Sequence, residues 1–410
     1  MTSPTIAILA TLDTKGREVR YLTEQLERLG GRARIVDLGV RGAPGLPPDV
    51  SREEVAAAAG TTVDALAAGD DADAAGRAMA EGAAARMLAE VDAGTVDGVL
   101  GLGGLRGTAA CTHVMRALPY GVPKVMVSTV ASGDTSAYVD VKDVTMMFAV
   151  GDILGLNALT RKLLANAAGA VFGMASVDVT LETAARDKPL IGMSNLGVLT
   201  RGAMRALERF EAKGYEVVVF HAVGSGGRAM EELMRQGVIG AVFDYAMGEI
   251  ADDVFEGLRA GGPTRLTVAG ELGLPQVLCP GGCEHLGVLV DPPNTVPERY
   301  RDHASVFHNP VVFVPRLKPD EFVRVAEEIA RRLGATSRDA AMMLPLGGTG
   351  RYAMEGGPLR DEAGDRAFFA ALKAALPPAI EVVERETHAE DPAFVDECVD
   401  RLVAMIEARP

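Results

Sequence analysis

Tryptophan is absent from this chain of 410 residues, and the aromatic residues together make up only 5% of it. Small residues take their place, with 47 glycines and long alanine runs. Helices with small side chains pack closely on a sheet, so this composition favours a compact α/β protein. The length is enough for two or three domains.

Cysteine and long hydrophobic stretches are also scarce. Four cysteines are too few for a disulfide framework. The N-terminus has no basic segment ahead of a hydrophobic stretch, and no apolar run approaches the roughly 18–20 residues of a membrane span. We therefore expect a soluble, cytoplasmic protein with free thiols and no membrane partner.

Positive charge is in the minority. The 41 lysines and arginines oppose 56 aspartates and glutamates, which gives a net charge of −15. No basic run is present, and this argues against a nucleic-acid partner. An acidic chain can still bind an anionic ligand, because N–H groups at a helix start attract phosphate locally. Nucleotides therefore stay open as ligands.

The sheet-building pattern occurs twice. Apolar strands at Ile6–Leu9 and Leu190–Met193 are each followed by a polar segment, an amphipathic helix and a second strand. A further matched pair begins at Gly121 (GVPKVMVST) and at Gly273 (GLPQVLCPG). This alternation predicts an α/β protein with two similar Rossmann-like subdomains and parallel sheets.

The predicted subdomains comprise residues 1–185 and 186–410, with a ligand cleft between them. Ligands of parallel sheets bind outside the carboxyl ends of the strands, so the segments that follow strands are the expected site. The first of these segments, Thr11–Gly16 (TLDTKG), is expected to be a polar loop before a helix that begins at Gly16.

A glycine-rich segment, GLGGLRGT at Gly101–Thr108, lies between a predicted strand and a helix. Glycine lets backbone N–H groups converge on an anion without a Cβ clash, and the helix start adds a favourable partial charge. Arg106 is placed to add a bidentate phosphate contact. An ordinary strand-to-helix turn is the alternative, and the segment is not a Walker A sequence.

Polar side chains of neighbouring loops complete the predicted nucleotide site. Lys15 is expected to reach a phosphate as a point charge, while Asp13 or Thr14 would alternatively cap the following helix. Asp134 is the candidate contact to magnesium or ribose, or else it bonds its own backbone. The predicted nucleotide-binding residues of the first half are Thr14, Lys15, Gly103, Gly104, Arg106, Gly107, Thr108, Ser128, Thr129 and Asp134.

The second half contains a comparable segment, GSGGRAMEE at Gly224–Glu232. The alternative is a turn in which Arg228 pairs with Glu231 or Glu232. The glycine spacing is not that of the dinucleotide fingerprint, which disfavours NAD. The predicted ligand-binding residues of this segment are Gly224, Gly226, Gly227 and Arg228.

The segment CPGGCEHLG contains Cys279, Cys283, Glu284 and His285. Its C-x3-C-x-H spacing is close to a zinc pattern, but a fourth ligand is not evident, so we predict no metal site there and favour a loop of buried thiols. A nucleophilic Cys283 assisted by histidine is an alternative.

Histidines near other strand ends supply the candidates for acid–base chemistry. His308 stands in an HNP segment, and His221 ends the strand before the GSGG segment. Histidine titrates near neutral pH and suits proton transfer. The catalytic residues are otherwise unassigned, and the candidates are His221, Glu284, His285 and His308.

Several segments occur in one order along the chain: ATLDTKGRE, GLGG-x-x-GT, LPYGVPKVMVST, SGD, DILGLN, VFHAVGSGGRAMEEL and HNP. With them the chain resembles the family that includes the N-terminal ATP-binding region of the tomato mosaic virus resistance protein. The resemblance covers nearly all of the chain. It implies two Rossmann-like subdomains, ATP binding, and a homodimer or higher homo-oligomer. A TIM-barrel domain follows in the plant relative, so such a partner would be a separate protein here.

Two segments depart from the family pattern. Leu105 and Arg106 replace a Ser-Gly pair in the expected GGSGGT, which either adds an arginine contact or weakens ATP binding. The expected PGALD reads PGGCE, so that Glu284 stands in place of the aspartate.

We predict an ATP-binding protein that holds the nucleotide on its glycine-rich loops and admits Mg²⁺ beside the phosphates. One alternative is a hydrolase or lyase that acts on a small anionic metabolite in the cleft. The other is a regulatory or assembly module that binds ATP without turnover.

Overall fold

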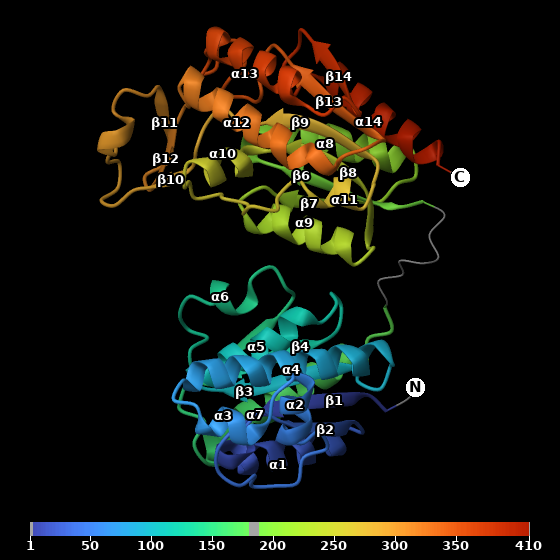
Figure 1. The fold of residues 1–410 in the computed structure, drawn as a ribbon, viewed down its shortest axis with the longest axis vertical. Coiled ribbons are helices and arrows are strands. Elements are labelled where there is room, and N and C mark those ends of the chain that lie inside the picture. The colour runs from blue at the N-terminus through green and yellow to red at the C-terminus, as the bar shows by residue number, and fades with distance from the viewer. Residues whose placement is uncertain (1–2, 180–187, 410) are drawn as a thin grey trace. The chain divides into compact units, whose positions relative to one another are not determined.

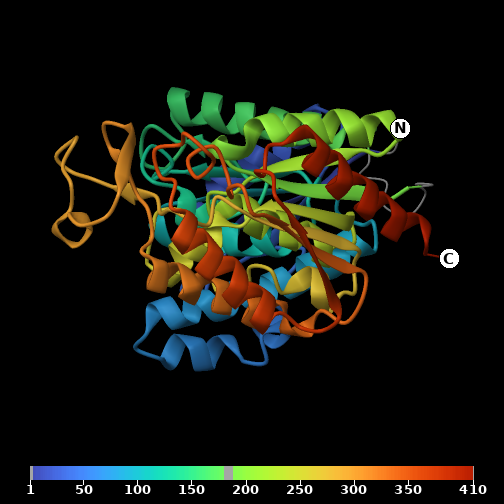
Figure 2. The same cartoon turned by 90° about the horizontal axis from the view of Figure 1, so that it is seen from above.

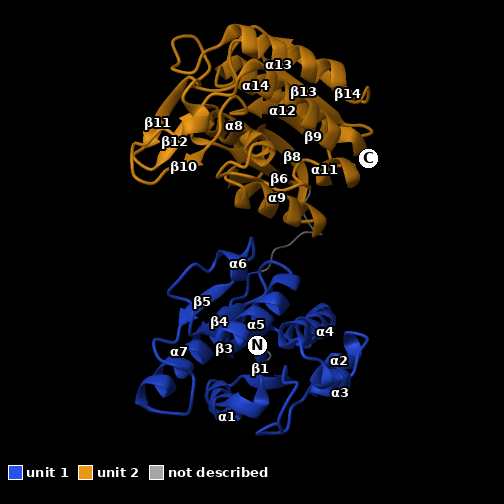
Figure 3. Ribbon diagram, turned by 60° about the vertical axis from the view of Figure 1, so that its left-hand side comes forward, with its two compact units in different colours: residues 1–181 blue, residues 182–410 orange. Residues whose placement is uncertain are grey.

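The computed structural model describes residues 3–179 and 188–409. The chain divides into unit 1, residues 1–181, and unit 2, residues 182–410 (Figure 3). Each unit has its own parallel sheet and its own core, so the predicted pair of Rossmann-like halves is confirmed. The predicted boundary between residues 185 and 186 lies outside the described residues.

Unit 1, coloured blue to green in Figure 1, contains a five-stranded parallel sheet in the order β2-β1-β3-β4-β5. The strands are β1 (Thr5–Ala10), β2 (Arg32–Asp37), β3 (Gly98–Gly103), β4 (Lys124–Ser128) and β5 (Thr145–Phe148). The helices are α1 (Leu12–Arg28), α2 (Arg52–Ala58), α3 (Val63–Ala68), α4 (Ala72–Asp92), α5 (Leu105–Ala117), α6 (Ser136–Val139) and α7 (Ala158–Ala175).

Alternate residues of β1 explain why helices cover both faces of this sheet. Ile6 and Ile8 pack into one core with residues of α1 and α7. Ala7 and Leu9 point to the opposite face and pack with residues of α2, α4 and α5. Successive side chains of a strand point to opposite faces, and here both sets are apolar and buried, as is typical of a doubly wound sheet.

The strand order of unit 1 reverses direction at β1. The chain passes from β1 to β2 on one side and then crosses to β3 on the other. The carboxyl ends of β1 and β3 therefore border the topological switch point, which is where doubly wound folds bind ligands.

Unit 2 contains a six-stranded parallel sheet in the order β14-β13-β9-β8-β6-β7. The strands are β6 (Leu190–Asn195), β7 (Val217–His221), β8 (Ile239–Ala246), β9 (Gln276–Gly281), β13 (Ala340–Pro345) and β14 (Ile380–Arg385). The α-helices are α8 (Thr200–Ala212), α9 (Ser225–Arg235), α10 (Gly248–Val254), α11 (Val268–Glu271), α12 (Pro319–Arg332), α13 (Glu362–Ala375) and α14 (Pro392–Glu407).

A small antiparallel sheet projects from one side of unit 2 (Figure 2). It consists of β10 (Val288–Leu289), β11 (Ser305–Asn309) and β12 (Val312–Pro315) in the order β10-β12-β11. None of the helices in the described part of the chain is long and apolar enough to cross a membrane.

The first predicted loop is a helix, which corrects the expectation for Thr11–Gly16. Helix α1 begins at Leu12 rather than at Gly16. The carboxylate of Asp37, at the end of the neighbouring strand β2, accepts a hydrogen bond of 3.1 Å from the backbone N–H of Leu12. A carboxylate of another strand thus caps the helix, whereas Asp13 and Thr14, the expected local caps, lie inside it.

Candidate functional site

A pocket of about 240 Å³ lies at the switch point of unit 1, beside the carboxyl ends of β1, β2 and β3. Its remaining wall comes from α3 and from the first turns of α4 and α5. The lining residues are Ala10, Thr11, Leu38, Val40, Arg41, Leu66, Ala72, Ala75, Gly76, Leu102, Arg106, Gly107, Ala110 and Cys111. We call it the switch-point pocket.

The start of α5 borders this pocket and is open to a ligand. Gly104 is its N-cap residue, and no side chain among the described residues caps this helix start. The first N–H groups of an α-helix have no partner within the helix, and they carry the positive end of its dipole. The start of α5 can therefore accept an anion from outside the chain.

The two other predicted anion sites at helix starts are occupied by carboxylates of the chain itself. Asp37 accepts from Leu12 at the start of α1. At the start of α9, Glu249 Oε1 accepts hydrogen bonds from the N–H groups of Gly224 and Gly227, at 2.6 and 3.1 Å. A phosphate would have to displace Glu249 to bind the GSGG segment.

The glycines of the first loop have different roles. A Cβ on Gly103 would lie 2.7 Å from the Cα of Gly107, so a glycine is needed there for the helix to approach the strand. A Cβ on Gly104 would meet only the hydroxyl of Thr129, at 3.7 Å, and one on Gly107 would meet only the carbonyl of Leu102, at 3.6 Å. Gly104 and Gly107 therefore border open space, whereas Gly103 serves packing.

Several predicted phosphate contacts have partners within unit 1. The hydroxyls of Thr108 and Ser128 lie 2.7 Å apart and are fully buried, so they connect α5 to β4. Lys15 donates a hydrogen bond from Nζ to the carbonyl of Ile153. Thr14 Oγ1 lies 3.0 Å from Thr11 Oγ1. The structure therefore places these four side chains in internal hydrogen bonds.

Asp134 bonds its own backbone, which is the alternative considered for it. Its Oδ1 accepts from the N–H of Ser136 at 2.9 Å, and this hydrogen bond lowers the pKa of Asp134. The N–H of Thr129 donates to the carbonyl of Gly103, which keeps Thr129 beside Gly104. Of the predicted residues, Arg106 and Gly107 line the switch-point pocket.

Sequence reasoning missed Thr11 and Arg41 as lining residues of the switch-point pocket. Arg41 lies in the glycine- and proline-rich segment after β2. A signal for it was present, because the end of β2 lies next to the end of β1 in a parallel sheet.

The GSGG segment of unit 2 packs against a buried arginine. Arg265 donates to Glu249 Oε2 at 2.7 Å and to both carboxylate oxygens of Asp244 at 2.6 and 2.7 Å, and it lies 3.8 Å from Glu231. All four side chains are at most 3% exposed. A Cβ on Gly227 would lie 2.1 Å from Glu249 Oε2, so this glycine makes room for the cluster.

Glu231 makes this cluster sensitive to pH. Burial raises the pKa of Glu231 from 4.5 to about 7, against the opposing effects of Arg265 and the N–H of Leu266. An acid with a raised folded-state pKa binds more protons in the folded state. Its contribution to stability is therefore complete below its unfolded-state pKa and is lost as the pH rises through its folded-state pKa.

We expect Glu231→Gln to flatten the pH dependence of stability. The free energy of unfolding of the wild type should fall by up to about 1.4 kcal/mol per pH unit more steeply than that of the variant between the two pKa values. Urea unfolding at a series of pH values measures both slopes. Equal slopes would contradict the assigned pKa of Glu231.

Among the candidate catalytic residues, Glu284 and His285 form a buried pair. His285 Nδ1 lies 2.9 Å from Glu284 Oε1, and Thr349 donates to Glu284 Oε2 at 2.8 Å. Burial acts to raise the pKa of Glu284, but the charge and hydrogen bond of His285, with the hydrogen bond from Thr349, lower it to about 2. The other ring nitrogen of His285 faces Arg259 at 3.3 Å.

The four candidate catalytic residues do not form one cluster. His308 Nδ1 lies 3.4 Å from the hydroxyl of Tyr352, whose ring packs 5.6 Å from that of His285. His221 instead ends the edge strand β7. The ends of β7 and β9 are three strand spacings apart, about 14 Å, which separates His221 from Glu284 and His285.

Cys279 and Cys283 are free and buried, as expected for a loop of buried thiols. Burial raises the pKa of both thiols well above the ordinary value, which disfavours a nucleophilic thiolate at Cys283. Within residues 3–179 and 188–409, no group of three or more His, Cys, Asp or Glu residues is placed to hold a metal ion.

Two family models together match most of the chain. The N-terminal domain of the uncharacterised protein family UPF0261 matches residues 4–180, and its C-terminal domain matches residues 188–406. A UPF0261 protein of Clostridium tetani is 38% identical over 98% of this chain and 99% of its own length. A relative from Rhizobium meliloti is 39% identical over 96% and 97%, respectively.

The ToMV resistance protein Tm-1(GCR237) of Solanum lycopersicum is 36% identical over 62% of this chain and 34% of its own length. Among solved structures, a putative UDP-N-acetylglucosamine 2-epimerase from Listeria monocytogenes is 11% identical and has a TM-score of 0.25. The match covers 93% of this chain and 100% of the epimerase chain. MurG of Acinetobacter baumannii is 13% identical and has a TM-score of 0.22, and the match covers 98% of this chain and 100% of the MurG chain.

Proposed function

The chain belongs to the uncharacterised protein family UPF0261, and we propose that it binds ATP in the switch-point pocket of unit 1. The observation that carries this proposal is the uncapped start of α5 beside that pocket. The starts of α1 and α9 hold carboxylates of the chain, while α5 keeps its N–H groups for a ligand. The resemblance described above implies the same ligand.

The charges around the pocket favour phosphate. Arg41 and Arg106 contribute two guanidinium groups to its lining, which contains no aspartate or glutamate. The side chain of Arg106 is 75% exposed and forms an ion pair of 3.0 Å with Asp73. An exposed ion pair of this kind contributes at most about 1 kcal/mol, so Arg106 can turn to a phosphate at small cost.

The apolar part of the lining suits the base. Leu38, Val40, Leu66 and Leu102 form this part of the wall. The volume is below the roughly 300–1,000 Å³ typical of whole ligand pockets. We therefore expect the pocket to hold the adenine end, with the phosphates against Gly104 and the first turn of α5.

Magnesium would be held by the nucleotide more than by the protein. Mg²⁺ prefers oxygen ligands and usually keeps several waters. Thr11 supplies the one side-chain hydroxyl of the pocket lining. The metal would therefore coordinate phosphate oxygens, water and this hydroxyl, and it would screen the phosphate charges.

The lining also favours binding without turnover. It contains no histidine, aspartate or glutamate to act as a general base, and burial raises the pKa of Cys111 to about 12. Positioned proton transfer to or from an attacking water needs such a group. This supports the regulatory or assembly alternative over a hydrolase at this pocket.

Isothermal titration of the purified chain with ATP and magnesium tests the proposal, with ADP, NAD and metal-free ATP as comparisons. We expect one ATP per chain with micromolar affinity, about −8 kcal/mol, and no binding of NAD. Phosphate release from the same mixture should stay at the uncatalysed rate. Absence of binding by every nucleotide would refute the proposal.

A further inference from the structure

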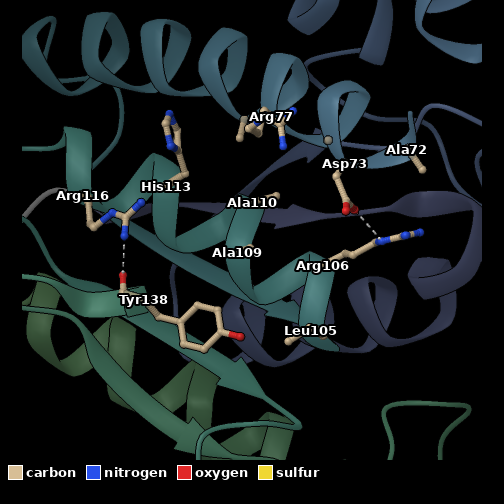
Figure 4. A pocket seen from close by; sticks show the side chains of 12 residues that line it. Ala72, Asp73, Arg77, Leu105, Arg106, Ala109, Ala110, His113, Arg116 and Tyr138 are labelled. Atoms are coloured by element: carbon tan, nitrogen blue, oxygen red, sulfur yellow. Dashed lines mark hydrogen bonds and ion pairs between the residues drawn. The ribbon is translucent and has the colours of Figure 1, made fainter. Parts of the chain in front are cut away.

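A second pocket, of about 550 Å³, lies along the outer face of α5 in unit 1. Residues of α4 form one wall and Tyr138 of α6 contributes to the other (Figure 4). Its lining residues on α5 extend from Leu105 to Arg116, which corresponds to about 16 Å of helix. We call it the α4–α5 groove. Its volume is in the range of small-molecule sites.

The groove combines an apolar floor with positive charge. Its floor consists of small or apolar side chains of α4 and α5, among them Gly76, Ala80, Leu105 and Ala109. Arg77, Arg106 and Arg116 line it against the single carboxylate of Asp73. The chain has a net charge of −15, whereas three arginines and one carboxylate give the lining of the groove a net positive charge.

Three polar side chains of the groove, His113, Tyr138 and Arg77, have no close side-chain partner in the described part of the chain. Neither the ring nitrogens of His113 nor the hydroxyl of Tyr138 forms a hydrogen bond there, and Arg77 has only a carboxylate of Asp71 at 3.8 Å. Arg116 donates from Nη1 to the carbonyls of Ala137 and Tyr138, at 2.5 and 3.5 Å, which leaves the Nε and Nη2 hydrogens for a ligand.

We propose that the α4–α5 groove binds a small anionic metabolite whose phosphate or carboxylate lies on an apolar body. His113 and Arg116 are one helical turn apart on α5, and Arg77 extends toward α5 from α4 (Figure 4). These three side chains would hold the oxyanion, while the small side chains of the floor contact the apolar body. The groove shares Ala72, Gly76, Arg106 and Ala110 with the switch-point pocket, but the inference does not depend on ATP binding.

Isothermal titrations of the full chain with phenyl phosphate, phthalate, inorganic phosphate and neutral phenol test this inference. Phenyl phosphate and phthalate distinguish the two oxyanions, and the others separate charge from the apolar body. We expect at least one of the first two to bind one per chain, with a dissociation constant below about 1 mM and more tightly than phosphate or phenol.

Two variants locate the binding. Ala109 lines the groove but not the switch-point pocket, so Ala109→Leu should abolish probe binding, whereas Ala117→Leu at the exposed end of the same helix should not. Arg77→Gln should weaken binding about tenfold through loss of a charge-assisted hydrogen bond, and Arg86→Gln on the same helix should leave it unchanged. Circular dichroism confirms that each variant is folded.

Two results would overturn the inference. One is that neither aromatic anion binds the wild type. If the wild type is then a dimer by sedimentation and Ala109→Leu a monomer, the groove is a contact between two copies of the chain. The other result is that Ala109→Leu binds as tightly as the wild type.

Discussion

Replacing Arg265 with leucine is expected to destabilise unit 2 by about 3–5 kcal/mol, since it leaves buried carboxylates without their cation. Asp244 and Glu249 both accept hydrogen bonds from this guanidinium, and Glu231 lies 3.8 Å from it. All of them are excluded from water. An unpaired buried carboxylate retains the cost of desolvation and loses the attraction that offsets it.

Urea unfolding of the full chain measures this loss, with Arg205→Gln as the control. Arg205 forms two hydrogen bonds with Asp396, at 2.7 and 2.8 Å, on the exposed surface of the same unit, where water screens the pair, so Arg205→Gln should shift the urea midpoint far less than Arg265→Leu. If Arg265→Leu fails to fold, Glu249→Gln serves as a milder variant. It keeps an acceptor for Gly224 and Gly227, and should cost about 1–3 kcal/mol.

A loss below about 1 kcal/mol for Arg265→Leu would mean that water or a rearranged side chain compensates the carboxylates. The cluster would then not be the dry ion-pair network that the distances indicate.

The two halves of the fold were predictable from the sequence because their strands are apolar on both faces and alternate with amphipathic helices. The beginning of α1 was not predictable, because its cap comes from Asp37, twenty-five residues after Leu12. A local pattern cannot show which carboxylate another strand brings to a helix start. A capping box needs no such distant partner: at α2 the hydroxyl of Ser51 accepts from the N–H of Glu54, and the carboxylate of Glu54 accepts from the N–H of Ser51.

The candidate site was predictable only in part for a related reason. Glycines at a helix start are needed both where a ligand approaches and where the chain packs its own side chains. At α9 the close neighbour is Glu249, which follows Gly224 by twenty-five residues, so the sequence pattern alone does not distinguish the two uses. The hydroxyl pair of Thr108 and Ser128 depends on the pairing of β3 with β4 in the same way.

Replacing Gly107 with leucine is expected to weaken ATP binding about a hundredfold, which corresponds to about 2.8 kcal/mol. Gly107 lines the switch-point pocket but not the α4–α5 groove, and a Cβ there would meet only the carbonyl of Leu102. The leucine side chain would therefore extend into the space proposed for the nucleotide. Glycine in a helix is less favourable than leucine, so we expect the stability of unit 1 to stay equal or to rise by up to about 1 kcal/mol.

Gly173→Leu is the matched control, because Gly173 lies in α7, does not line the pocket, and has nothing within 4 Å of a Cβ. Calorimetric titration with ATP and thermal unfolding of both variants separate binding from stability. If Gly107→Leu binds ATP as tightly as the wild type, the nucleotide does not bind at the start of α5. Loss of affinity in both variants would indicate a general defect. Loss in Gly107→Leu alone would place the nucleotide at the start of α5, which has no cap from the described part of the chain, unlike the starts of α1 and α9.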